Sequence, residues 1–326
     1  MINLDCNYMG LKLRNPLIVG SSGLTNAVEN IVEIERNGAG AVVLKSLFEE
    51  QIHNAADPAF LREKALYQEP EEYIRNFSRP EDLNGYIELI RKAKKSVTIP
   101  VIASINCISD KGWVSYAKQI QEAGADGLEL NISVLPSDPE KEGADNEKTY
   151  FSITEKILKE VTIPVSVKVS FYFSDLAKTL TLLSGTGVKG LVLFNRFFSP
   201  DIDIEREELK TTFVFSTPSE IAISLRWISM LSPIVKCDLC ASTGVHDGTG
   251  LIKQLLAGAR AVQIASVLYQ KGFMEIASMI DYLENWMERH GYRSIDDFRG
   301  KLAGSVLGNP ASNERVLFMK HFSGIE

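Results

Sequence analysis

The chain has few of the features that mark secreted, membrane-spanning or disulfide-stabilised proteins. Its 326 residues include four cysteines, at positions 6, 107, 237 and 240, which are too few and too scattered for a disulfide framework. No apolar run approaches the roughly 20 residues that a membrane-spanning helix needs. The start, "MINLDCNYMG", lacks the basic and apolar regions of a secretory signal. We therefore expect a cytoplasmic protein without a membrane partner.

Basic residues are also scarce relative to acidic ones. The formal net charge is −7, and no long basic tract is present. Because nucleic-acid binding needs clustered Lys and Arg, we expect a small-molecule partner and no nucleic acid. The one Cys-x-x-Cys motif, Cys237 to Cys240, has no second pair of zinc ligands near it in the sequence. We expect two packed thiols there and no metal site.

What the sequence does contain is a weak internal repeat, in which a helix ending in Gly-Ala or a similar pair is followed by an apolar strand. The Gly suits a helix C-cap, and the apolar run suits a strand buried on both faces. The four copies are "NGAGAVVLKS" (37–46), "EAGADGLELNIS" (122–133), "GTGVKGLVLFNR" (185–196) and "LAGARAVQIAS" (256–266). Four further apolar runs lie between them, "NPLIVGSS" (15–22), "IPVIASIN" (99–106), "IPVSVKVS" (163–170) and "IVKCDLCAS" (234–242). The chain therefore predicts eight strands.

Helical periodicity separates these strands and follows the last one, which favours a (β/α)8 barrel in one domain spanning 1–326. An open, doubly wound sheet would want a Gly-rich dinucleotide turn after its first strand, and the chain has no G-x-G-x-x-G. Alternation around Met9-Gly10 predicts an N-terminal β-hairpin that caps the barrel. Long strand-to-helix loops at 47–84, 134–149 and 197–217 are of the kind that covers an active site.

Polar side chains stand where the predicted strands end, and in such barrels that end carries the catalytic groups. A single serine at a strand end is readily explained by contact with water. Lys45 in "AVVLKS" and Lys168 in "PVSVKVS" are different, because an ammonium at the end of an apolar strand is costly without an anion or acceptor nearby. Asn131 and Asn195 offer donors and acceptors for a ring that carries C=O and N–H groups.

The chain resembles a known family over most of its length. "GLKLRNPLIVGSSG", "LKS", "LELNIS", "PVSVKVS", "GLVLFNR" and "STGVHDGTGLIKQLLAGARAVQIAS" occur in the order and spacing typical of the class 1 dihydroorotate dehydrogenases. These enzymes are FMN-containing barrels. The resemblance implies an FMN-dependent dehydrogenase acting on a CH–CH bond, which oxidises dihydroorotate to orotate in pyrimidine biosynthesis by hydride transfer to flavin N5.

The resemblance also implies a role for each strand-end residue. The flavin would lie against side chains that follow the first two strands, and Lys168 would reach its N1/O2 edge, where a cation stabilises the reduced form. The FMN phosphate would bind to the loops after strands seven and eight. The implied cofactor-binding residues are Ser21, Ser22, Lys45, Ser46, Asn106, Asn131, Lys168, Asn195, Thr243, Gly244, Ala265 and Ser266.

The chain departs from the family after "ELNIS". The family has a cysteine there that removes the substrate proton, followed by Pro-Asn, whereas this chain has Val134, Leu135 and Pro136. Valine cannot accept a proton. The candidate catalytic residues are Lys45 beside the flavin, Ser133 next to the altered position, and His53 in the loop after the second strand, since histidine has a suitable pKa.

Three functions stay open. The first is oxidation of dihydroorotate, the second is an FMN enzyme acting on a different C=C or CH–CH bond, and the third is a flavin-binding protein without turnover. The sequence shows no electron acceptor, because it has neither four clustered cysteines for an iron–sulfur centre nor a dinucleotide fingerprint. A small polar ring is the expected substrate, and the resemblance suggests a homodimer.

Overall fold

The eight predicted strands form a closed parallel barrel in the computed structural model, which describes residues 2–56, 81–109, 114–197, 200–211, 215–304, 315–316 and 318–320. Parallel pairing of the strand at Ala41–Val43 with the strand at Val101–Cys107 closes the barrel. Around it the strands are β4 (Ala41–Val43), β3 (Leu17–Val19), β13 (Ala261–Ile264), β12 (Asp238–Ser242), β9 (Gly190–Leu193), β8 (Val165–Val169), β7 (Gly127–Ile132) and β6 (Val101–Cys107). The predicted (β/α)8 barrel is confirmed.

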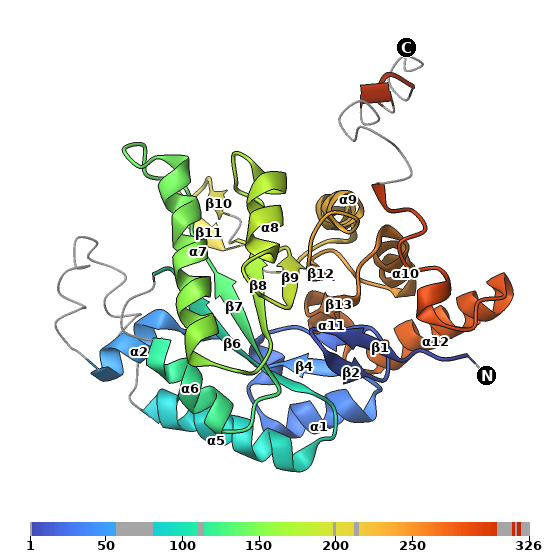
Figure 1. Ribbon diagram of the computed structural model, residues 1–326, viewed down its shortest axis with the longest axis horizontal. Coiled ribbons are helices and arrows are strands. Elements are labelled where there is room, and N and C mark those ends of the chain that lie inside the picture. The colour runs from blue at the N-terminus through green and yellow to red at the C-terminus, as the bar shows by residue number, and fades with distance from the viewer. Residues whose placement is uncertain are drawn as a thin grey trace.

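Helices lie between successive strands and cover the outside of the barrel. Figure 1 shows α5, α6 and α7 on one side of the strands and α9, α10 and α12 on the other. The α-helices are α1 (Val28–Arg36), α2 (Glu49–Ala56), α5 (Glu81–Ser96), α6 (Val114–Glu122), α7 (Gly143–Glu160), α8 (Leu176–Ser184), α9 (Ile221–Leu231), α10 (Gly248–Ala257), α11 (Ser266–Lys271) and α12 (Met274–His290). Short 3-10 turns occupy Gly23–Thr25, Pro218–Glu220 and Ile295–Asp297. No helix in these described ranges is long and apolar enough to cross a membrane.

Strand residues alternate between two hydrophobic clusters, because successive side chains of a strand point to opposite faces. In β4, Val42 belongs to the large cluster between the strands and the helices, whereas Ala41 and Val43 belong to a smaller cluster inside the barrel. Lys45 follows β4 by two residues, outside the strand, and is half-buried at the carboxyl-terminal end of the barrel.

The predicted N-terminal hairpin closes the opposite end of the barrel. Strands β1 (Cys6–Tyr8) and β2 (Leu11–Leu13) are antiparallel, and the turn between them places Met9 at φ 57° and Gly10 at φ 81°. Tyr8, Met9 and Leu13 are at most 2% exposed and pack into the interior cluster. The amino-terminal end of the barrel is thereby filled with side chains, and the carboxyl-terminal end holds the polar residues.

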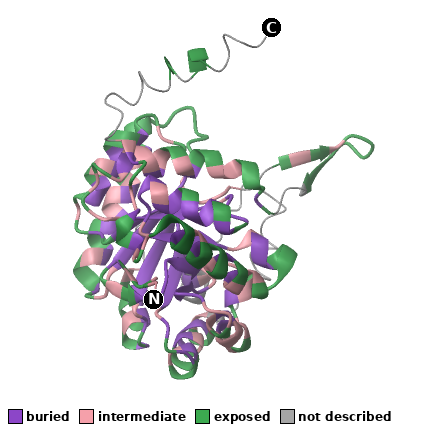
Figure 2. Cartoon of the chain, turned by 90° about the vertical axis from the view of Figure 1, so that its right-hand side faces the viewer, coloured by how far each residue is buried: buried purple, intermediate pink, exposed green. Residues whose placement is uncertain are grey.

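The three long loops contain secondary structure. After β4, the chain forms β5 (Leu47–Phe48), which pairs with β6, and then α2. Helix α7 begins at Gly143, inside the predicted loop 134–149. The loop 197–217 carries an antiparallel hairpin of β10 (Pro200–Asp203) and β11 (Glu208–Thr211), and Figure 2 shows a mostly exposed hairpin projecting from the barrel.

Candidate functional site

A cavity of about 160 Å³ opens at the carboxyl-terminal ends of β3, β8, β9, β12 and β13. The residues that form its wall come from segments up to 245 positions apart in the chain and include much of the site predicted from the sequence. Its predicted members are Ser21, Lys168, Asn195, Thr243, Gly244, Ala265 and Ser266. An adjoining hollow of about 220 Å³ shares Asn195, Arg196 and Thr243 with it and is lined by Phe171 and other aromatic rings.

A chain of serine hydroxyls runs from Ser21 in the cavity wall, through Ser46, to Ser104 in the middle of β6. Ser21 Oγ accepts a hydrogen bond from Ser46 N at 2.8 Å and lies 3.0 Å from Ser46 Oγ. Ser46 Oγ lies 2.8 Å from Ser104 Oγ of β6. Ser22 is used differently, because its hydroxyl accepts from Leu24 N and caps the following 3-10 turn. Ser21 and Ser46 therefore belong to the mouth, whereas Ser22 stabilises the local turn.

Asn106, Asn131 and Lys168 lie side by side across three neighbouring strands. Asn106 is the register partner of Asn131 in the β6–β7 pair, and Asn131 is the partner of Lys168 in the β7–β8 pair. Asn131 is 9% exposed, and its buried Oδ1 has no hydrogen-bond partner among the described residues. A buried amide oxygen that lacks a partner is unfavourable, so the row is suited to a polar ligand that donates to Asn131.

The loop after β12 has a backbone that requires glycine at position 244. Thr243 and Gly244 both have positive φ, at 74° and 79°, and Thr243 Oγ1 donates to Phe194 O at 3.0 Å. A Cβ on Gly244 would lie 2.1 Å from Ile221 N. The loop therefore packs directly against the start of α9, and its backbone runs along the cavity.

Two buried residues at the floor of the site were not singled out from the sequence. Glu129 of β7 and Gln263 of β13 are 1% and 2% exposed. Gln263 Oε1 accepts from Lys168 Nζ at 3.0 Å, and Gln263 Nε2 donates to Glu129 Oε2 at 2.5 Å. Glu129 precedes Asn131 by two positions in an otherwise apolar strand, and the cost of burying a charge, which singled out Lys168, also applies to it.

The position at which the family has its catalytic cysteine lies in apolar surroundings in this chain. Val134 packs against the hydrophobic core and lines a hollow of about 370 Å³ together with Pro136, Tyr150 and Phe171. Ser133 is half-buried, and its backbone N–H donates to Cys107 O. His53 belongs to α2, but its side chain lies outside the described part of the structure. Lys45 is half-buried at the end of β4.

His246 supports the wall of the cavity from outside. Its ring Nε2 lies 2.9 Å from Ser216 Oγ, and Ser216 N donates to Ser266 Oγ at 3.0 Å. Burial, followed by the nearby Lys271 ammonium, lowers the pKa of His246 below its usual value. A neutral imidazole therefore links the loop after β12 to the loop after β13.

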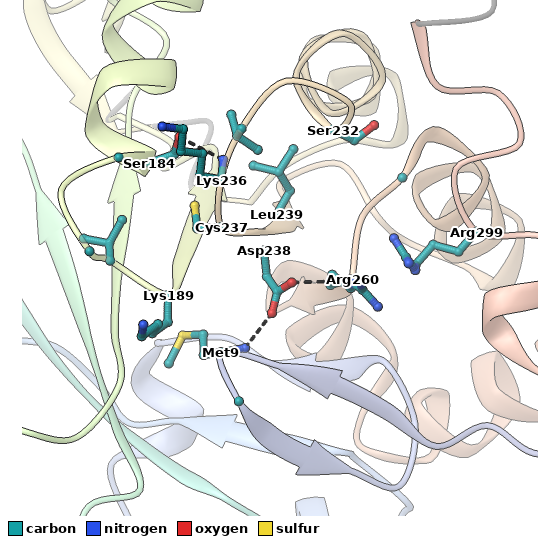
Figure 3. A pocket seen from close by; sticks show the side chains of 16 residues that line it. Met9, Ser184, Lys189, Ser232, Lys236, Cys237, Asp238, Leu239, Arg260 and Arg299 are labelled. Atoms are coloured by element: carbon teal, nitrogen blue, oxygen red, sulfur yellow. Dashed lines mark hydrogen bonds and ion pairs between the residues drawn. The ribbon is translucent and has the colours of Figure 1, made fainter.

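A larger hollow of about 520 Å³ lies at the other end of the barrel, around the predicted thiol pair (Figure 3). Asp238 accepts from Met9 N at 2.9 Å and pairs with Arg260 at 3.3 Å, so it fastens the hairpin to the barrel. Helices α8 and α10 end at this hollow, and its wall includes Lys189, Lys236, Arg260 and Arg299. Cys237 and Cys240 are free thiols, and burial raises the pKa of Cys237 to about 12.

Comparison with known proteins shows that the chain is similar to one enzyme family over most of its length. The family model for dihydroorotate dehydrogenase matches residues 3–287. The catalytic subunit of dihydroorotate dehydrogenase B (NAD(+)) from Thermoplasma acidophilum is 26% identical over 305 residues, which cover 92% of this chain and 99% of that protein. The corresponding subunit from Pyrococcus abyssi is 27% identical over 307 residues, covering 91% and 98%. Dihydroorotate dehydrogenase A (fumarate) from Lactococcus lactis subsp. lactis is 26% identical over 319 residues, covering 92% and 99%.

Proposed function

Because the chain belongs to the dihydroorotate dehydrogenase family, we propose that it is an FMN-dependent dehydrogenase that oxidises a CH–CH bond of a small polar ring. Dihydroorotate is the first substrate to test. The observation that carries the proposal is one cavity lined by Lys168, Ser21 and the loops after β12 and β13. A cation, a row of amides and a backbone loop together suit a ligand that has both a polar ring and a phosphate.

The residues present fit FMN. When bound, FMN would accept a hydride from the substrate and gain negative charge at its N1/O2 edge. Lys168 would stabilise that charge, and the unpartnered Oδ1 of Asn131 would accept a hydrogen bond from a ring N–H. Backbone N–H groups of Thr243–Gly244 and Ala265–Ser266 would hold the phosphate. Ser21, Ser46, Asn106 and Asn195 would orient the ring, and Ser22 would support the turn beside it.

Proton removal is the step for which this chain departs from the family pattern. A positioned general base contributes about 10² to 10⁴ in rate, and Val134 supplies none. Ser133 and His53 are the two side chains that we propose as replacements, with Lys45 stabilising negative charge beside them. If neither acts on dihydroorotate, the alternatives are another C=C or CH–CH substrate, for which the apolar hollow beside Val134 favours a less polar ring, and flavin binding without turnover.

Anaerobic stopped-flow reduction of bound FMN by dihydroorotate tests this proposal. We expect slow reduction by the native protein and faster reduction by Val134→Cys, which restores an acidic thiol at that position. Loss of native reduction in Ser133→Ala would assign the base to Ser133, and the same loss in His53→Ala would assign it to His53. If dihydroorotate perturbs the flavin spectrum of none of these proteins, the substrate is a different ring.

We also propose that residues 1–326 act as one FMN-binding domain and that the protein is a cytoplasmic homodimer. Support for a second copy comes from the projecting β10–β11 hairpin, on which Ile202 and Leu209 are exposed. Sedimentation velocity of the FMN-loaded protein tests the oligomeric state. A single monomer peak at micromolar protein would contradict the homodimer.

A further inference from the structure

The Lys168 ammonium is held from within the barrel by two side chains, Gln263 in the cavity wall and Glu129 beneath it. Glu129, Lys168 and Gln263 belong to β7, β8 and β13, and their exposures are 1%, 8% and 2%. Gln263 bonds to both of the others, at 3.0 Å to Lys168 Nζ and 2.5 Å to Glu129 Oε2. A buried carboxylate, an amide and an ammonium therefore form one continuous row under the site.

Glu129 fixes the orientation of the Gln263 amide. An ionised carboxylate only accepts hydrogen bonds, so the –NH₂ group of Gln263 must face Glu129. The amide oxygen is then left facing the ammonium of Lys168. Gly20 makes room for this arrangement, because a Cβ at that position would lie 3.2 Å from Gln263 Oε1. The row therefore depends on a carboxylate that does not line the cavity itself.

The same carboxylate also weakens the positive potential of Lys168. Glu129 Oε1 lies 3.9 Å from Lys168 Nζ and has no hydrogen-bond partner in the described chain. Two opposite charges so close together and out of water interact strongly. Tyr8 and Cys240 share the barrel interior, and burial raises the pKa of each well above its usual value, so both are neutral near pH 7. They add no further negative charge beside Glu129.

We propose that Glu129 and Gln263 are positioning residues that set the reduction potential of the flavin through Lys168. The inference rests on the proposed FMN site. Gln263 keeps the ammonium toward the cavity, which favours the reduced flavin, and Glu129 offsets part of the ammonium's charge, which disfavours it. The two residues therefore act on the potential in opposite directions, and a merely structural role in packing the barrel predicts no such opposition.

The test is the two-electron reduction potential of the FMN-loaded protein. Glu129→Gln should shift the potential to a more positive value, because it removes a buried negative charge while keeping the shape. Gln263→Met should shift it to a more negative value, because the ammonium then closes on the unpartnered Glu129 Oε1. A tenfold change in the ratio of the affinities for reduced and oxidised FMN corresponds to about 30 mV. Asp126→Asn is the control, since Asp126 bonds to Lys94 and Val101 N at the amino end of β7 and should leave the potential unchanged.

An FMN-free readout separates this inference from the flavin assignment. In the protein stripped of cofactor, the rate of reductive methylation of Lys168 by formaldehyde and a borane, followed by mass spectrometry, should be higher in Glu129→Gln than in the native protein. Equal rates, or an unchanged potential in a Glu129→Gln variant that binds FMN, would overturn the proposal. If Glu129→Gln does not fold, an unchanged potential in Gln263→Met overturns it. If the native protein binds no FMN, the proposed function is refuted. The methylation rates then show by themselves whether Glu129 acts on Lys168.

Discussion

Lys168 is the residue on which the chemistry of the site depends most. The residue is 8% exposed, its ammonium is hydrogen-bonded to Gln263, and it belongs to the wall of the cavity. Lys168→Met should lower the flavin reduction potential, because the reduced, anionic form loses its adjacent cation whereas the oxidised form loses little. Lys189→Met, which changes an exposed lysine at the opposite end of the barrel, is the control. An unchanged potential in a Lys168→Met protein that still binds FMN would show that Lys168 does not face the N1/O2 edge.

Replacing Gly244 by alanine should weaken FMN binding, and a second glycine with a similar φ serves as the control. Gly244→Ala places a Cβ 2.1 Å from Ile221 N at φ 79°, whereas Gly291→Ala has a similar φ of 72° and nothing within 4 Å. Both changes cost about 1–2 kcal/mol for the left-handed backbone. Only the first also displaces the loop, so FMN affinity should fall by at least about tenfold, or 1.4 kcal/mol, in Gly244→Ala alone. Fluorescence titration with FMN measures it, and equal affinities in the two variants would contradict the role of this loop.

At the scale of elements, the hairpins differ in what they contribute to stability. Leu13 of β2 is 2% exposed inside the barrel, whereas Leu209 of β11 is 81% exposed. We expect Leu13→Ala to lower the free energy of unfolding by about 2–5 kcal/mol. Leu209→Ala should change it by less than about 0.5 kcal/mol. Urea denaturation measures both, and similar losses would mean that the N-terminal hairpin does not plug the barrel.

The elements also show how far the sequence could predict the fold. Seven of the eight barrel strands lie within the predicted apolar runs and β6 extends one residue beyond its run, because strands buried on both faces are marked by continuous apolar sequence. Helix α7 begins at Gly143, and its first turns are largely polar, with Asn146 buried by tertiary packing rather than by a periodic apolar face. In the β10–β11 hairpin the apolar residues Ile202 and Leu209 are exposed and the two aspartates of β10 are half-buried, so its sequence has no core-facing pattern.

The site residues that stand at the ends of apolar strands could be predicted from the sequence. The partnership of Glu129 with Gln263 could not. Lys168, Thr243 and Ser266 were found because strand ends in a barrel converge on one mouth. Glu129 lies in the middle of β7, and its hydrogen bond with Gln263 depends on strands that are distant in sequence but meet across the barrel. Only the closed arrangement of β7, β8 and β13 shows that their side chains meet.

At the scale of the whole molecule, the central claim is that the barrel binds FMN at its carboxyl-terminal mouth. The most direct measurement is the absorbance spectrum and mass of the chromophore released by denaturing the purified protein, with titration of added FMN if the protein is purified without it. The account predicts a flavin spectrum, the mass of FMN, and one FMN for each chain. A colourless protein that also fails to bind added FMN would contradict it.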